Sequence, residues 1–80
     1  MNTPMPPDDE LIHALHAALQ SAPDNLPLRK HLAELLLKNE RYKDAENEYR
    51  QALELAPRDA TLKCGLADTY FRQGKPDVAL

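Results

Sequence analysis

Residues 32–57, LAELLLKNERYKDAENEYRQALELAP, decide the fold of this chain. Apolar residues recur at intervals of three and four on both sides of the polar turn 39–41, which is the spacing of two amphipathic helices. Ala45 and Ala52 flank Tyr49 at helical spacing, and such small side chains let a neighbouring helix approach closely. Pro57 ends the second helix, because the residue before a proline is disfavoured in the α region. The stretch therefore predicts a helical hairpin.

The same pattern recurs along the chain at an offset of 34 residues (57 − 23). Ala22-Pro23 returns as Ala56-Pro57, and Leu32-Ala33 returns as Leu66-Ala67. A period of this length is typical of helical solenoids, in which each repeat buries its apolar face against the next one. The repeat predicts an all-α architecture of antiparallel helix-turn-helix units, truncated within the second repeat.

We predict helices near residues 8–22, 26–39, 42–56 and 60–73, the start of a fifth at 76, and a disordered segment 1–7 before one domain, 8–80. Asp8 and either Asp24 or Asn25 suit the N-caps of the first two helices, and Gly74 suits the end of the fourth. The predicted inward residues are Leu11, Leu15, Ala18, Leu19 and Ala22, then Leu28, Leu32, Leu35 and Leu36, then Tyr42, Ala45, Tyr49, Ala52, Leu53 and Ala56, and finally Leu62, Leu66, Ala67 and Tyr70.

Composition disfavours several classes of function. The net charge is −3 with both signs interspersed, so there is no basic stripe to bind a nucleic acid. No apolar run approaches the roughly 20 residues of a membrane span. The single cysteine, Cys64, leaves no disulfide framework and favours a reducing compartment, so we expect a cytoplasmic protein.

The repeat resembles the tetratricopeptide repeat (TPR) family. The resemblance covers residues 8–80 and rests on Leu32-Ala33, Leu66-Ala67, Tyr70, Gly74 and the series Ala45, Tyr49, Ala52, Pro57. The chain departs from the family pattern at Leu36, where an aromatic is expected, and at Glu40, where a glycine is expected. Arg29 and Lys63 stand where the family places a large aromatic, and Leu28 and Leu62 are the candidates to fill that space.

The resemblance implies a concave face lined by the first helix of each pair. Its residues are Lys30, Glu34, Leu37, Lys38, Cys64, Asp68, Phe71 and Arg72. One interpretation is a binding face, in which Leu37 and Phe71 contact an apolar anchor and the charges orient a peptide or partner protein. The alternative is an ordinary solvated helix surface. The carboxylate clamp of some TPR domains does not fit, because Glu34 and Gly65 replace the asparagines that it needs.

No catalytic residue, cofactor or metal site is predicted. His13 and His16 lie three apart on one helix, but two ligands make a poor metal site. Cys64 has no base and orienting group placed beside it by the sequence, so it reads as a small packed residue rather than a nucleophile. We therefore expect a chain that is not an enzyme.

Three functional classes stay open. The first is a protein–protein interaction module or scaffold, and the second is an N-terminal accessory domain of a larger enzyme, such as an AAA-type ATPase. The third is a homo-oligomer formed through the incomplete C-terminal end. For the third we expect Leu62, Leu66, Tyr70 and Phe71 to form an exposed apolar strip, because the helix that should cover them is only begun.

Overall fold

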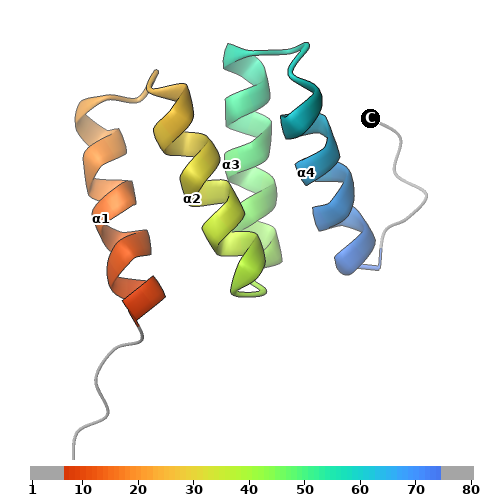
Figure 1. Cartoon of the computed structure of the whole chain (residues 1–80), viewed down its shortest axis with the longest axis horizontal. Coiled ribbons are helices and arrows are strands. Elements are labelled where there is room, and N and C mark those ends of the chain that lie inside the picture. Colours follow the sequence, from red (N-terminus) through yellow and green to blue (C-terminus); the bar gives the residue numbers. More distant parts are fainter. Residues whose placement is uncertain (1–6, 75–80) are drawn as a thin grey trace, which may run out of the picture.

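The computed structural model describes residues 7–74, which form four helices joined by short turns (Figure 1). They are α1 (Pro7–Ser21), α2 (Leu26–Lys38), α3 (Tyr42–Leu55) and α4 (Ala60–Arg72). These described residues contain no strand, and the predicted all-α repeat architecture is confirmed. The fifth helix expected from residue 76, and residues 1–6 of the segment expected to be disordered, lie outside the described part of the chain.

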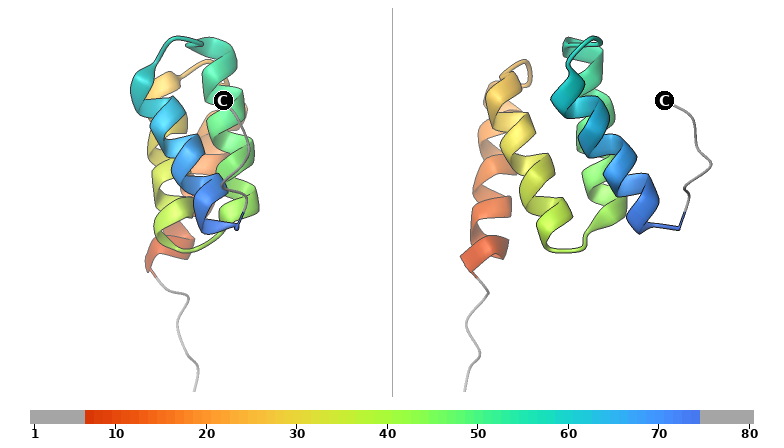
Figure 2. Two further views of the ribbon diagram at one scale, coloured as in Figure 1. Left: turned by 90° about the vertical axis from the view of Figure 1, so that its right-hand side faces the viewer. Right: turned by 45° about the vertical axis from the view of Figure 1, so that its right-hand side comes forward.

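Successive helices run antiparallel and stand in a row from α1 to α4 (Figure 1). α3 packs between α2 and α4, while α2 also contacts α4 directly. Viewed along the row, α2 and α4 lie toward one side and α3 toward the other (Figure 2, left). α2 and α4, the first helices of their pairs, therefore lie on one face of the molecule, as the solenoid pattern predicts.

The core is a single cluster between the helices. Leu32, Leu36 and Leu62 are almost completely buried at its centre. Ala45 and Ala52 are fully buried, as predicted, so that α3 approaches its neighbours closely. Tyr49 is also buried, and its ring lies against α4. The small residues of α3 thus set the spacing of the helices around it.

The inward faces of α1 and α4 were predicted partly wrongly. In α1, Leu11 is 38% exposed and Ala18 is exposed, while Ile12 is buried with Leu15 and Leu19. Because side chains advance by about 100° per residue, Ile12, Leu15 and Leu19 share a narrower face than the predicted stripe. In α4, Ala67 is exposed and Thr69 is fully buried.

Local sequence explains how the helices begin. Asn25 caps α2 by accepting a hydrogen bond from the backbone N–H of Leu28 at 3.1 Å. Asp59 caps α4 in the same way, accepting from the N–H of Leu62 at 3.1 Å. Asp8 is not the cap of α1, since that helix begins one residue earlier at Pro7, a position where the missing N–H costs nothing.

The helix ends repeat with the sequence period. Gly74 follows α4 with φ of 78°, the left-handed conformation predicted for it. Glu40, its counterpart 34 residues earlier, has φ of 62° after α2. The turn geometry is therefore kept in both repeats, although in the first it is imposed on a residue with a side chain, which raises its energy.

A buried ion pair occupies the place where the family pattern has a large aromatic. Nη1 of Arg29 on α2 donates to Oε1 of Glu48 on α3 at 2.7 Å, and both side chains are about nine-tenths buried. Nη2 of Arg29 donates to the carbonyl of Pro23 at 3.1 Å. Leu28, the residue expected to fill this space, is only partly buried. The gap is thus filled by charge pairing.

The exposed apolar strip expected on α4 is largely absent. Leu62, Leu66 and Tyr70 are buried, because α4 turns them toward α3. Arg50 of α3, for example, donates a hydrogen bond to the hydroxyl of Tyr70. Of the four residues only Phe71 is exposed, at 69%. The apolar surface on which the oligomer hypothesis was based is therefore reduced to one side chain.

Candidate functional site

α2 and α4 present the same pattern on the face that they share. The predicted site residues stand at positions i, i+4, i+7 and i+8 in each helix, so the members of a set lie along one side of it. On α2 they are Lys30, Glu34, Leu37 and Lys38, and on α4 they are Cys64, Asp68, Phe71 and Arg72.

A hollow of about 380 Å³ opens on this face and is lined by Glu34, Leu37, Lys38, Tyr49 and Arg72. We call it the groove. Four of its five lining residues were predicted from the sequence as site residues. Tyr49 was assigned to the core alone, and it contributes the floor because α3 runs beneath α2 and α4. Lys30, Cys64, Asp68 and Phe71 lie on the same helix faces without lining the hollow.

Tyr49 joins all three helices at the groove. Its ring lies so close to Gly65 of α4 that a Cβ on that glycine would meet Cε1 of the ring at 2.3 Å. A sequence signal for this contact existed, since a glycine inside a helix costs about 1 kcal/mol relative to alanine and suggests close packing. The asparagine of a carboxylate clamp would not fit at position 65 for the same steric reason.

The environment of the Tyr49 hydroxyl is both buried and negative. Burial, followed by the carboxylates of Glu34 and Asp68, raises the pKa of Tyr49 to about 12. Both neighbours act in the same direction because each disfavours a phenolate. The hydroxyl therefore stays protonated, with one carboxylate contributed by α2 and the other by α4.

The cationic residues of the predicted site are already paired within the molecule. Nζ of Lys30 lies 2.7 Å from Oδ2 of Asp59. Nε of Arg72 lies 3.0 Å from Oδ1 of Asp68. Lys30 therefore points toward the N-terminus of α4. Arg72 is paired with Asp68, which lies one turn earlier in the same helix.

Lys38 makes the loosest of these pairs. Its Nζ lies 3.7 Å from Oδ2 of Asp8, and its side chain is 73% exposed. In contrast, Glu34 is exposed and has no ion-pair partner among residues 7–74. The groove therefore has one unpaired charge in the described structure, and that charge is negative.

The apolar members of the site differ in exposure. Phe71 exposes 69% of its surface, more than any other large apolar residue among residues 7–74. Leu37 is partly buried and packs against the core while lining the groove. Cys64 is an exposed free thiol on the same side of α4.

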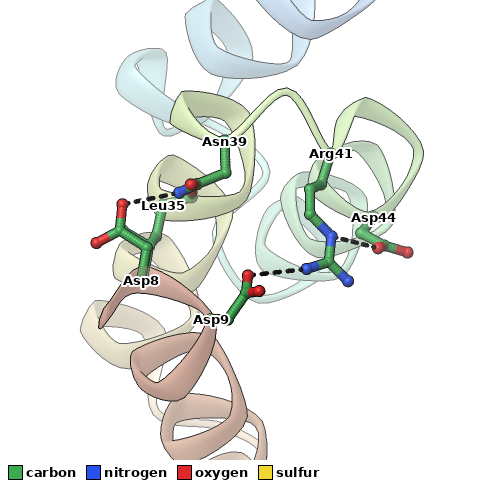
Figure 3. Close-up of polar contacts among 6 residues, drawn as sticks. All are labelled: Asp8, Asp9, Leu35, Asn39, Arg41 and Asp44. Atoms are coloured by element: carbon green, nitrogen blue, oxygen red, sulfur yellow. Dashed lines mark hydrogen bonds and ion pairs between the residues drawn. The ribbon is translucent and has the colours of Figure 1, made fainter. Parts of the chain in front are cut away.

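A polar cluster fixes α1 to the turn between α2 and α3 (Figure 3). Nδ2 of Asn39 donates to Oδ2 of Asp8 at 3.0 Å and to the carbonyl of Leu35 at 2.8 Å. Nη1 of Arg41 lies 3.4 Å from Oδ1 of Asp9, and its Nε lies 3.7 Å from Oδ2 of Asp44. Such exposed pairs contribute at most about 1 kcal/mol each, so the cluster orients α1 rather than forming a reactive centre.

The described residues were also compared with the requirements of a metal site and of a membrane span. Among residues 7–74, no group of three or more histidine, cysteine, aspartate or glutamate side chains is placed to hold a metal ion. His13 and His16 are both exposed on α1. Within the same residues, no helix has the length and apolarity that crossing a membrane would need.

Comparison with known proteins gives a family. A family model described as tetratricopeptide repeat matches residues 30–80, and a second model with the same description matches residues 9–49. Each match covers more than half of the chain, and together they span residues 9–80, which include α2, α3, α4 and all but the first two residues of α1. Searches of curated proteins and of solved structures returned no significant match.

Proposed function

The chain belongs to the tetratricopeptide repeat family, and from this premise we propose that it binds a partner protein or peptide in the groove between α2 and α4. Repeats of this family are in general protein–protein interaction modules and are typically not catalytic. The groove lies on the face that α2 and α4 share, where the resemblance to this family implies binding. The free, exposed thiol of Cys64 is compatible with the cytoplasmic location that we also propose.

One observation carries the proposal: Phe71 is 69% exposed on the helix face that borders the groove. A phenylalanine ring that stays in water forgoes a large favourable burial, whereas a partner's apolar side chain could cover it. Leu37, on the facing helix, offers a second apolar surface within the groove. Aromatic anchors of this kind, surrounded by charges, are typical of residues that dominate binding energy.

The test uses an array of immobilised 12-residue peptides of degenerate sequence as the probe. We expect a subset to bind the wild-type chain and to bind Phe71→Ala about 5- to 100-fold more weakly, which corresponds to roughly 1–3 kcal/mol. Leu37→Ala should weaken binding in the same direction. Leu55→Ala is the matched control, because Leu55 is an exposed apolar residue of α3 that does not line the groove.

Circular dichroism of each variant separates loss of binding from loss of folding. If folded Phe71→Ala and Leu37→Ala proteins bind the same peptides as tightly as wild type, the groove is not the binding surface. If Leu55→Ala alone loses binding, the partner surface lies on the other side of α3.

A further inference from the structure

We infer that the partner presents a basic side chain, lysine or arginine, to the groove, where its cation lies against the carboxylate of Glu34 and beside the hydroxyl of Tyr49. The inference rests on the proposed function and adds the chemistry of the ligand. From the sequence, charges of both signs on this face are expected to orient the ligand, and we now assign a basic group of that ligand to Glu34.

The charges that line the groove are the first argument. Glu34, Lys38 and Arg72 are its charged lining residues. Lys38 pairs with Asp8 and Arg72 pairs with Asp68, while Glu34 has no ion-pair partner within residues 7–74. A cationic ligand would complete a pair with Glu34, whereas an acidic ligand would have to share a cation that Asp8 or Asp68 already neutralises.

The Tyr49 hydroxyl is the second argument. Tyr49 is only 4% exposed, lines the groove, and has no hydrogen-bond partner among the described residues 7–74. Its oxygen can accept a hydrogen bond from an ammonium or guanidinium group. A charge-assisted hydrogen bond of this kind is stronger than one from a neutral donor. A bound cation would therefore satisfy two groups at once.

The third argument is the sign of the potential at the floor of the groove. Glu34 on α2 and Asp68 on α4 both act electrostatically on the Tyr49 hydroxyl, and both contribute to raising the pKa of Tyr49. The cation of Lys38, by contrast, sits on a side chain that is 73% exposed and is screened at the rim. Arg72, the other cation of the lining, is paired with Asp68, so Glu34 is the charge left to attract a ligand group, and it attracts a positive one.

The apolar surfaces next to this point complete the description of the ligand. Leu37 lines the groove and Phe71 is exposed beside it, so an apolar residue is expected next to the basic one. The ligand class is therefore a peptide segment with lysine or arginine adjacent to an apolar side chain. The charge fixes its orientation, and the apolar residue supplies most of the affinity.

The experiment starts from the peptides that bind on the degenerate array. We expect lysine and arginine to be enriched among them over aspartate and glutamate. The best arginine-containing binder is then synthesised with citrulline in place of arginine, which keeps the shape and removes the charge. Citrulline should weaken binding to wild type about tenfold, the size expected for a charged hydrogen bond.

A double-mutant cycle assigns the contact. Against Glu34→Gln, the arginine and citrulline peptides should bind with nearly equal affinity, because the charge that discriminates them is gone. Glu54→Gln is the control: Glu54 is exposed on α3 and does not line the groove, so the tenfold difference should persist.

The outcomes distinguish a failure of this inference from a failure of the proposed function, which is binding in the groove. If groove-dependent binders, meaning those lost in Phe71→Ala, are enriched in acidic residues, the inference is wrong while the proposed function stands. The same holds if arginine and citrulline peptides differ equally in wild type and Glu34→Gln. If no peptide binds, or if every binder is indifferent to Phe71→Ala, both are wrong.

Discussion

The ring of Tyr49 on α3 and the backbone of Gly65 on α4 are in such close contact that a Cβ on the glycine would come within 2.3 Å of the ring atom Cε1 and 2.7 Å of the hydroxyl oxygen. The contact holds Tyr49 in place at the floor of the groove, where the carboxylates of Glu34 and Asp68 both act on its hydroxyl. The geometry of the candidate site therefore depends on the absence of one side chain.

Gly65→Ala is expected to lower the free energy of unfolding by about 1–3 kcal/mol through overpacking against Tyr49. The sign is diagnostic, because a glycine-to-alanine change inside an open helix stabilises by roughly 0.5–1 kcal/mol. Urea unfolding followed by circular dichroism measures the change. In a Tyr49→Leu background the ring is gone, and the same substitution should be neutral or stabilising. Equal effects in both backgrounds would contradict the packing described here.

Removing one member of the buried Arg29–Glu48 pair should destabilise strongly. Glu48→Leu leaves the Arg29 cation buried without its partner, a change that typically costs about 3–5 kcal/mol. The double variant Arg29→Met with Glu48→Leu should recover most of this loss, since an apolar pair of similar volume is often as stable. Moreover, Nε of Arg29 already lacks a hydrogen-bond partner within residues 7–74. If the double variant is no more stable than Glu48→Leu, the unpaired Arg29 cation is not the cause of the lost stability.

Glu40→Gly should stabilise the chain. Glu40 has φ of 62°, a conformation that costs a residue with a Cβ roughly 1–2 kcal/mol, while the greater freedom of glycine in the unfolded chain offsets part of the gain. We expect a net increase of about 0.5–1 kcal/mol in the free energy of unfolding. Glu40→Ala is the matched control, because it removes the same side chain and keeps the Cβ. A gain of equal size in both variants would point to the charge instead of the backbone.

Stability should fall in acid partly through Asp59. The hydrogen bond from Lys30, followed by the one from the backbone N–H of Leu62, lowers the pKa of Asp59 below its usual value near 4. The folded chain binds this proton less readily than the unfolded one, so the stabilisation is present above the unfolded pKa and is lost as pH falls through the folded pKa. Asp59→Asn keeps a capping side chain.

In Asp59→Asn, the loss of stability below about pH 4 should be smaller than in wild type. Urea unfolding at a series of pH values measures it. Asp24→Asn, a change of the same kind at an exposed position in the turn before α2, is the control and should leave the profile unchanged. An unaltered acid profile in Asp59→Asn would mean that its pairing with Lys30 contributes nothing in solution.

Tyr49 should ionise at a higher pH than an ordinary tyrosine. Its pKa is raised from 10.0 to about 12, and because the folded state holds the proton more tightly, stability is complete below pH 10 and is lost as pH rises toward 12. The ultraviolet absorbance of the phenolate follows the titration, and the difference from Tyr49→Phe assigns it. Glu34→Gln should lower the pKa of Tyr49, whereas Glu54→Gln should not. An unchanged value in Glu34→Gln would place Glu34 farther from the hydroxyl than the structure does.

Most of the fold could be predicted because local rules decide it. Helical periodicity, the prolines after Ala22 and Ala56, and the turn residue Gly74 act within a few residues of the chain. The 34-residue repeat then required each hairpin to pack against the next, so Ala45 and Ala52 were correctly predicted to be buried. The errors arose where a face is decided by a neighbour: Ile12 rather than Leu11 meets α2, and Thr69 rather than Ala67 is buried in α4.

The candidate site was likewise determined partly by the sequence and partly by the tertiary structure. From the sequence alone came the two matching rows of residues on α2 and α4, because helical spacing dictates which side chains share a face. Only the tertiary structure decided that Tyr49 forms the floor, that Lys30 pairs with Asp59, and that Glu34 has no ion-pair partner among residues 7–74. These outcomes depend on distances between helices far apart in the chain, and no local preference encodes which charges meet across a packed interface.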